Sequence, residues 1–384
     1  MGKTYTIRID EFQKLINGLH RRRYQCIGPV LQQGVVTYDE LATSELLPLG
    51  IADRQSPGCY RLEKATLPAV FGTHPGPVTW KSFLWPDFAP IFDALRTADG
   101  FEIRSAAVPF EKYAFIGVRP CDLHAIETLD LVFHKRPGSA NDYTGRRKTL
   151  FVVAVNCTSA ANTCFCETMG TGPEALSGYD LCLTELPDPV DHRFLITVGS
   201  AEGMNLAGAL KTESATLSDL QKVRGLLADT VKKMAGKLDI ADLKNLLYGL
   251  LDHPHWGETA ARCLACGNCT MVCPTCFCTT VADTTDLAGR QAKRYRRWDS
   301  CFNLCFSYLH GGYVRSSIAA RYRHFVIHKL ATWVDQFGRP GCVGCGRCIT
   351  WCPAGIDITA AVDTIRQISE ASGTKKEQGY VLDR

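Results

Sequence analysis

CLACGNCTMVCPTCFC, residues 263–278, places six cysteines within sixteen residues. A second stretch, CVGCGRCITWCPAGIDI, begins at Cys342 and carries four more. Both stretches contain the pattern Cys-x2-Cys-x2-Cys-x3-Cys-Pro. Three cysteines at intervals of three wrap a tight loop, so their thiolates converge on one inorganic group. The fourth cysteine follows the turn and faces away, and the proline after it lets the backbone leave without an unmet N–H donor.

This spacing is typical of proteins that bind two [4Fe-4S] clusters, in which the fourth cysteine of each motif ligates the other cluster. We therefore assign one cluster to Cys263, Cys266, Cys269 and Cys352, and the other to Cys342, Cys345, Cys348 and Cys273. Structural zinc is the alternative. Zinc sites favour two Cys-x2–4-Cys pairs per metal, whereas each motif here packs three cysteines into seven residues.

The remaining composition is that of a folded protein with two or three domains. The chain has 384 residues, of which 46% are hydrophobic and 21% charged, and its net charge of +4 gives no global field for nucleic acid. The first residues lack the apolar region of a signal peptide, and no apolar run approaches the ~20 residues of a membrane span. Nineteen cysteines in such a chain indicate metal ligands rather than disulfides, so we expect a cytoplasmic location.

Cysteine density and hydrophobic patterns divide the chain into four parts. We expect an α/β domain over 1–215, a helical connector over 216–254, an α-helical ferredoxin-like domain over 255–365 and a polar tail over 366–384. The first part begins with a strand and a helix, for which Asp10 is the expected N-cap and the apolar residues from Phe12 to Leu19 form one face. Ser218 is the expected cap in the connector. Residues 281–340, rich in arginine and aromatic residues, are expected to be helical.

The first domain contains a candidate for a third metal site. Two continuous apolar runs, YAFIGV (113–118) and LFVVAV (150–155), suit strands buried on both faces. A cysteine follows each run, at the carboxyl edge where open α/β sheets hold ligands, and two more come seven and nine residues after the second. The four candidates are Cys121, Cys157, Cys164 and Cys166. We expect a third cluster here; zinc or buried, inert thiols are the alternatives.

Three thiols are surplus to the two ferredoxin-like motifs: Cys276, Cys278 and Cys301. The segment Thr-Cys-Phe-Cys at 275–278 repeats the segment at 163–166, so these thiols could face the third site and shield it. They could instead be packing residues near the clusters, where they would tune the reduction potential. We favour the second interpretation.

Other patterns carry weaker signals. The basic run from Arg290 to Arg297 is interleaved with aromatic residues; a cluster-shielding helix or a subunit interface is a better interpretation than nucleic-acid binding. A second set of basic residues, which includes Lys329, would place positive charge beside anionic clusters. The loop His74-Pro75-Gly76 is expected to be structural, and no Ser-His-Asp grouping or catalytic pair of carboxylates is evident.

The chain resembles the β subunit of cytoplasmic NAD(P)-linked [NiFe] hydrogenases, also called sulfhydrogenases, from about residue 20 to 360. The resemblance is carried by GVRPCDLHAIETLD, NCTSAANTCFCETMGTGP with GYDLCLTEL, CPTCFC, RRWDSC and CVGCGRCITWCPAGIDI. The second of these segments is the most specific, because ferredoxin motifs alone are widespread. The electron-relay subunit of anaerobic sulfite reductase is a near relative. The wide gap between the two motifs also resembles the α-helical ferredoxin domain of succinate dehydrogenase and heterodisulfide reductase subunits.

The resemblance implies an electron relay within a complex and no catalytic residue in this chain. An FAD- and NAD(P)-binding iron–sulfur subunit would exchange electrons with NAD(P)H, and the small and large [NiFe] hydrogenase subunits would hold the nickel–iron site. It implies no flavin, nickel or nicotinamide here, and the sequence has no G-x-G-x-x-G after a strand and no P-loop. The alternatives are a sulfite-reductase relay, a stand-alone Fe–S enzyme using the N-terminal metal site, and a zinc-stapled interaction module.

Overall fold

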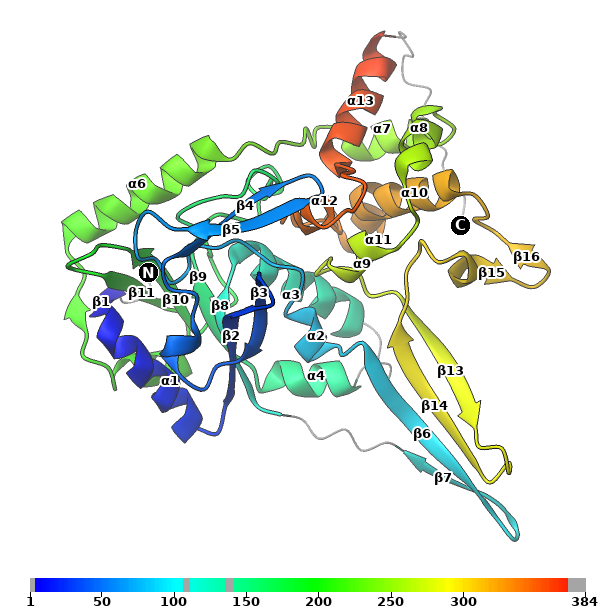
Figure 1. Ribbon diagram of the computed structural model, residues 1–384, viewed down its shortest axis with the longest axis horizontal. Coiled ribbons are helices and arrows are strands. Elements are labelled where there is room, and N and C mark those ends of the chain that lie inside the picture. The colour runs from blue at the N-terminus through cyan, green and yellow to red at the C-terminus, as the bar shows by residue number, and fades with distance from the viewer. Residues whose placement is uncertain (1–3, 106–110, 135–140, 372–384) are drawn as a thin grey trace.

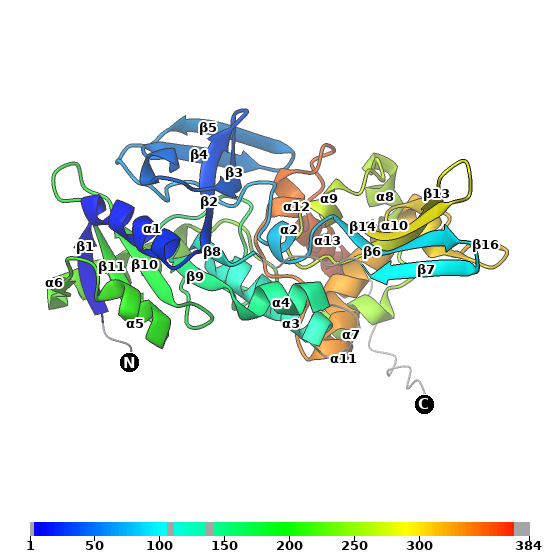
Figure 2. The ribbon, with the colours of Figure 1, turned by 90° about the horizontal axis from the view of Figure 1, so that it is seen from below.

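The computed structural model describes residues 4–105, 111–134 and 141–371, and the part of the expected tail from residue 372 lies outside them. An eight-stranded sheet forms one end of the molecule and a group of helices the other, as Figure 1 and Figure 2 show. A four-stranded sheet, which we call the arm, projects from the helical end. None of the described helices is long and apolar enough to cross a membrane.

The eight-stranded sheet is mixed. Its strands follow the order β12 (Glu213–Ser214), β1 (Thr4–Arg8), β11 (Arg193–Val198), β10 (Leu181–Leu186), β9 (Phe151–Val155), β8 (Tyr113–Val118), β2 (Gln25–Gln32) and β3 (Val35–Glu40). The central strands β10, β9, β8 and β2 are parallel, and antiparallel strands complete both edges. The two apolar runs in the sequence are therefore neighbouring parallel strands, β8 and β9, as predicted.

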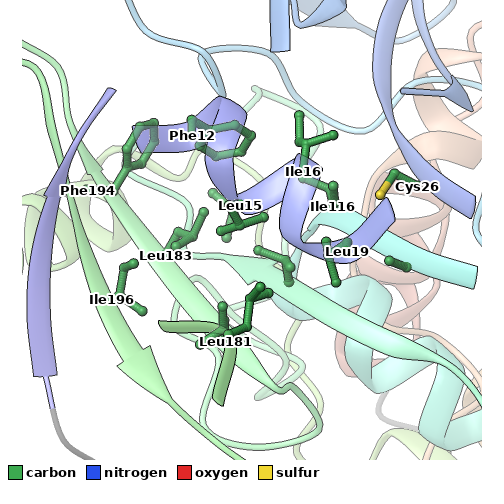
Figure 3. Close-up of a cluster of buried hydrophobic side chains, with 14 of the residues drawn as sticks. Phe12, Leu15, Ile16, Leu19, Cys26, Ile116, Leu181, Leu183, Phe194 and Ile196 are labelled. Atoms are coloured by element: carbon green, nitrogen blue, oxygen red, sulfur yellow. The ribbon is translucent and has the colours of Figure 1, made fainter. Parts of the chain in front are cut away.

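Helices cover both faces of this sheet. The helices are α1 (Phe12–Arg21) and α5 (Ala201–Ala207) on one face, and α3 (Pro120–His134) and α4 (Asn141–Lys148) on the other. Because successive side chains of a strand point to opposite faces, Ile116 packs with α1 and Phe115 packs beneath α3. Figure 3 shows Phe12 and Leu15 of α1 lying over Leu183. The predicted apolar face of this helix is confirmed.

Two expected helix caps are wrong. Asp10 lies in a 3-10 turn that precedes α1, and no side chain caps α1. The helix α6 (Leu217–Lys233) is capped by Thr216 rather than Ser218. In this capping box, the side chains of Thr216 and Asp219 each accept a hydrogen bond from the other residue's backbone N–H. Ser218 therefore lies inside the first turn of the helix. A second helix in the expected connector, 216–254, is α7 (Leu243–Gly249).

The helical end is built around one apolar core that includes Trp256, Phe325 and Val362. Besides α7, the helices at this end are α8 (His255–Arg262), α9 (Asn268–Met271), α10 (Ile318–Ile327), α11 (Trp333–Phe337), α12 (Arg347–Thr350) and α13 (Ile358–Ala371). A five-residue π-helical turn joins α10 to α11. The hairpin of β4 (Ile51–Ser56) and β5 (Cys59–Lys64) lies against this end, because Gly58 N donates to Ile349 O at 3.1 Å.

The arm corrects one expectation. Its strands follow the order β13 (Thr279–Thr285), β14 (Gln291–Trp298), β6 (Phe88–Thr97) and β7 (Gly100–Ser105), and α2 (Lys81–Leu84) precedes β6. Residues 281–298 thus form a β-hairpin, with its connection at 286–290, rather than the expected helix, and the basic run lies mainly on β14. Pairing with β6, from the first third of the chain, overrides local propensity here. A short hairpin of β15 (Tyr308–Leu309) and β16 (Gly312–Tyr313) follows before α10.

Candidate metal centres

Five cysteines line a cavity at the helical end, and four of them form one predicted set. These four are Cys263, Cys266, Cys269 and Cys352, the set assigned to the first cluster. The loop that carries the first three turns through left-handed conformations at Ala265 (φ 51°) and Gly267 (φ 76°). A Cβ on Gly267 would lie 2.9 Å from Ser300 Oγ, so the turn requires glycine. The remaining wall is largely apolar and includes Tyr322.

A second cavity is lined by the other predicted set, Cys273, Cys342, Cys345 and Cys348. Cys348 also lines the first cavity, so the two cavities are neighbours. The fourth cysteines are placed as the motif predicts: Cys352 lies with the first loop and Cys273 with the second. The structure thus brings both sets together, and iron ligation by these eight sulfurs stays a prediction.

The structure also brings together the four cysteines of the predicted third site. Cys121, Cys164 and Cys166 pack in one small buried cluster at the carboxyl edge of β8 and β9. Burial raises the pKa of Cys164 to about 12, and the nearby Cys157 sulfur adds to this rise. Cys157 therefore lies near this cluster. Cys345 of the second cavity packs against the same cluster. Sequence reasoning missed this fifth thiol, because nothing in the ferredoxin-like motif marks one ligand as facing a third group.

The four cysteines of the predicted third site, Cys121, Cys157, Cys164 and Cys166, are called the third group below. This group and the second cavity share a wall. Phe165 N donates to Gly344 O at 2.8 Å, and Thr171 Oγ1 donates to Val343 O at 2.7 Å. A Cβ on Gly344 would lie 2.7 Å from the backbone of Cys166. Only glycine therefore allows the two cysteine loops to approach this closely.

The chemistry of these positions fits iron–sulfur clusters. Burial raises the pKa of Cys342 to about 12 although the Lys329 ammonium opposes the rise, so its thiol needs the charge of a metal ion to ionise. Iron would supply that charge, and its binding would release the protons. Each set offers four sulfur ligands in largely apolar surroundings. Within residues 4–105, 111–134 and 141–371, no three His, Cys, Asp or Glu side chains are grouped to hold a single metal ion.

The three surplus thiols lie beside the second cavity. Cys276 lies close to Cys273 and lowers the pKa of that thiol, and Cys301 lies close to Cys278 and lowers the pKa of Cys278. Both repeated Thr-Cys-Phe-Cys segments contact the loop around Gly341 and Gly344: Thr275 Oγ1 donates to Gly341 O at 2.6 Å, and the earlier segment contacts Gly344 as described above. The repeated segments thus share one loop but belong to different thiol groups. Their placement favours packing beside the second cavity over shielding of the third site.

Comparison with known proteins places the chain in a family. A family model described as a 4Fe-4S dicluster domain matches residues 262–356. Sulfhydrogenase 2 subunit beta of Pyrococcus furiosus is 36% identical over 262 residues, which cover 67% of this chain and 75% of the relative. The chain belongs to the sulfhydrogenase β-subunit family. No solved structure matches it.

Family membership and the dicluster match together indicate at least two [4Fe-4S] clusters in this sulfhydrogenase β subunit. The matched region contains all eight cysteines of the two ferredoxin-like motifs. It begins after the predicted third group, so that site depends on the geometry of this chain alone.

A buried lysine faces the second cavity of this sulfhydrogenase subunit. Lys329 is 4% exposed, and its Nζ donates to Cys273 Sγ and Thr275 Oγ1, both at 3.1 Å. No carboxylate forms an ion pair with it among the described residues. Because a buried charge needs a counter-charge, the thiolates of this cavity are the natural partner. The sequence pattern had placed Lys329 among cations expected near the clusters.

Lys329→Met should lower the reduction potential of the centre in the second cavity. At an effective dielectric constant of about 20, a charge this close contributes about 2–3 kcal/mol, or about 100 mV for one electron. The ammonium stabilises the reduced, more negative state, so its loss makes reduction harder. The measurement is an anaerobic redox titration followed by EPR. Lys232→Met, at an exposed lysine on α6, is the control. An unchanged potential in Lys329→Met would contradict this account.

A buried ion pair connects the third group to the second cavity. Arg347, between Cys345 and Cys348, donates to both carboxylate oxygens of Asp122 at 2.9 Å, and Asp122 directly follows Cys121. The two side chains are 0% and 1% exposed. Sequence reasoning missed this pair, because its members lie 225 positions apart.

Proposed function

We propose that this chain is the iron–sulfur relay between a flavin subunit that oxidises NAD(P)H and a [NiFe] hydrogenase module. Its membership of the sulfhydrogenase β-subunit family and its dicluster domain support an electron-transfer role. Each [4Fe-4S] cluster would accept and release one electron. The observation that carries the proposal is the contiguity of three cysteine groups, with Cys348 lining both cavities and Cys345 packed against the third group.

The chain's own residues would fix the spacing along this route. Arg347 and Asp122 hold the second loop against α3, and Gly344 permits contact with the Cys164–Cys166 segment. Rigid elements that hold redox groups at fixed separations let electrons pass without rearrangement of the protein. We further propose that the helical end is of the α-helical ferredoxin type, in which the β13–β14 hairpin is inserted between the two motifs.

We propose that the third group, Cys121, Cys157, Cys164 and Cys166, holds a further [4Fe-4S] cluster. Four sulfurs gathered at the carboxyl edge of parallel strands support it. A buried cation is also in place, because Arg119 is 6% exposed and its Nη1 lies 3.8 Å from Cys157 Sγ. Such a cation would offset the negative charge of a cluster held by thiolates.

The arm is a candidate contact surface for the partner subunits. Its edge strand β7 exposes Phe101 and Ile103, which are 69% and 67% exposed. Basic side chains of β14, such as Lys293 and Arg297, are exposed on the same sheet. A projecting sheet with uncovered aromatic and basic side chains suits an interface with another subunit.

Anaerobic purification of the intact complex from its native source tests this function. We expect nickel, flavin, iron and acid-labile sulfide to copurify with the chain. Siroheme without nickel would instead identify a sulfite-reductase relay. Zinc without iron would establish an interaction module, and reduction of a small substrate by the isolated chain would establish a stand-alone enzyme. Any of these three results would overturn the proposal.

A further inference from the structure

Asp53, His74 and Ser159 form a hydrogen-bonded line that the sequence did not reveal. His74 Nδ1 lies 3.0 Å from Asp53 Oδ1, and His74 Nε2 lies 3.3 Å from Ser159 Oγ. The side chain of Asp53 is fully buried, that of His74 is 9% exposed, and Ser159 is exposed at the surface. The line therefore runs from solvent to a buried carboxylate, through a loop that was expected to be structural.

The hydrogen bonds allow His74 to gain and lose a proton without moving. The Asp53 carboxylate accepts from the ring N–H at Nδ1 and also from the His74 backbone N–H at 2.6 Å, which fixes the ring. In the neutral ring Nε2 accepts from the Ser159 hydroxyl, and in the charged ring it donates to the same oxygen. Ser159 thus connects Nε2 with water in both states.

The same network extends to the cysteine loops. Asp53 Oδ2 accepts from Gln55 Nε2 at 2.6 Å, and Gln55 Oε1 accepts from Thr350 Oγ1 at 2.8 Å and from Thr163 Oγ1 at 3.4 Å. Thr163 directly precedes Cys164, and Ser159 follows Cys157 by two residues. His74 is therefore tied at both ends to the loop that carries the predicted third site.

His74 is the group of this line that can hold a proton on either ring nitrogen. Several elements pack around His74, and each contributes titratable or charged groups. These groups are Asp53 on β4, Tyr38 on β3, Arg119 before α3, Glu185 on β10, Asp122 on α3, Arg347 on α12, and the thiols of Cys157 and Cys164. Arginines keep their charge in proteins. Burial raises the pKa of Tyr38 far above neutrality. Despite burial, hydrogen bonds from His74 and Gln55 leave the pKa of Asp53 below its usual value.

We propose that His74 is the proton acceptor coupled to the predicted third centre. It takes a proton from water through Ser159 when that centre gains an electron, and it returns the proton when the electron leaves. The electron comes from the donor that feeds the relay, so charge and protons balance over one cycle. An added negative charge in a buried region is costly unless a positive charge appears nearby. This inference rests on the third cluster proposed above.

The test is an EPR-monitored redox titration of the reconstituted full-length chain over about pH 5 to 8, the range in which histidine side chains commonly change charge. The third-centre signal is the one absent from the Cys164→Ser/Cys166→Ser variant. We expect its midpoint potential to fall with rising pH, by up to about 59 mV per unit for one proton per electron. The sign follows because imidazolium favours the reduced centre. His74→Gln, which keeps hydrogen-bonding capacity but cannot be charged, should remove the slope.

The chain offers a matched control. His255 on α8 also lies between a carboxylate and a hydroxyl, with Glu258 Oε2 at 2.8 Å and Thr259 Oγ1 at 3.3 Å, but outside the third group. His255→Gln should keep the wild-type slope. A wild-type potential that does not depend on pH overturns the proposal, whether or not His74→Gln folds. A slope that survives in His74→Gln, or one that disappears in His255→Gln, also overturns it. About eight irons in the wild-type chain would refute the third cluster itself, and the coupling with it.

Discussion

The double variant Cys164→Ser/Cys166→Ser is expected to carry about eight iron atoms per chain where the wild-type chain carries about twelve. The two thiols are 7% and 6% exposed and belong to the third group rather than to either ferredoxin-like cavity. Removing both should therefore empty one site and leave the dicluster domain loaded. Iron and acid-labile sulfide analysis of anaerobically prepared protein checks this, with EPR spin counting as a second readout.

Cys182→Ser is the matched control for this loss. Cys182 is also buried near the sheet edge, and its Sγ donates to Asn156 Oδ1 at 3.5 Å, a bond that a serine hydroxyl can replace. It should keep about twelve irons. A double variant that also kept about twelve, or a wild-type chain with about eight, would show that the third group consists of inert thiols.

Asp122→Asn should lower the free energy of unfolding by about 3–5 kcal/mol, the usual cost of removing one partner from a buried ion pair. Arg347 would keep its charge at 0% exposure, with one of its two carboxylate contacts replaced by an amide N–H. Anaerobic denaturant unfolding of the full chain measures the change. Because Arg347 lies between two cysteines of the second cavity, the same variant should also broaden the EPR signal of that centre.

Asp283→Asn is the control for this second prediction. Asp283 pairs with Arg294 at 2.7 Å on the arm, where both side chains are exposed, and exposed pairs contribute little to stability. Its unfolding curve should match that of the wild-type chain. If Asp122→Asn were as stable as Asp283→Asn, the buried pair would not lock the two cysteine loops together.

Much of the dicluster arrangement could be predicted because it is encoded locally. Three cysteines in one tight loop must point to a common centre, whatever surrounds them. The placement of Cys273 and Cys352 in each other's cavities also followed from the motif. The neighbouring parallel strands β8 and β9 followed from two runs that are apolar at every position, since such strands need cover on both faces.

Long-range contacts account for what the sequence did not predict. The β13–β14 hairpin was expected to be helical, but backbone pairing with β6 supplies hydrogen bonds that no local pattern reveals. The Asp122–Arg347 pair and the line from Asp53 to Ser159 likewise join residues that are distant in the chain. Polar residues scattered in this way carry no periodicity, and they become a site only when the fold brings them together.

By itself, then, the sequence determined the cysteine loops, the two strands that end at the third group, and the family of the chain. Tertiary structure alone decided which loops touch, that Cys345 faces the third group, and where buried charges such as Lys329 lie. The physical reason is one of range. Loop geometry is set by bonded neighbours and backbone dihedral angles, whereas contact between loops depends on packing and charge pairing across the whole fold.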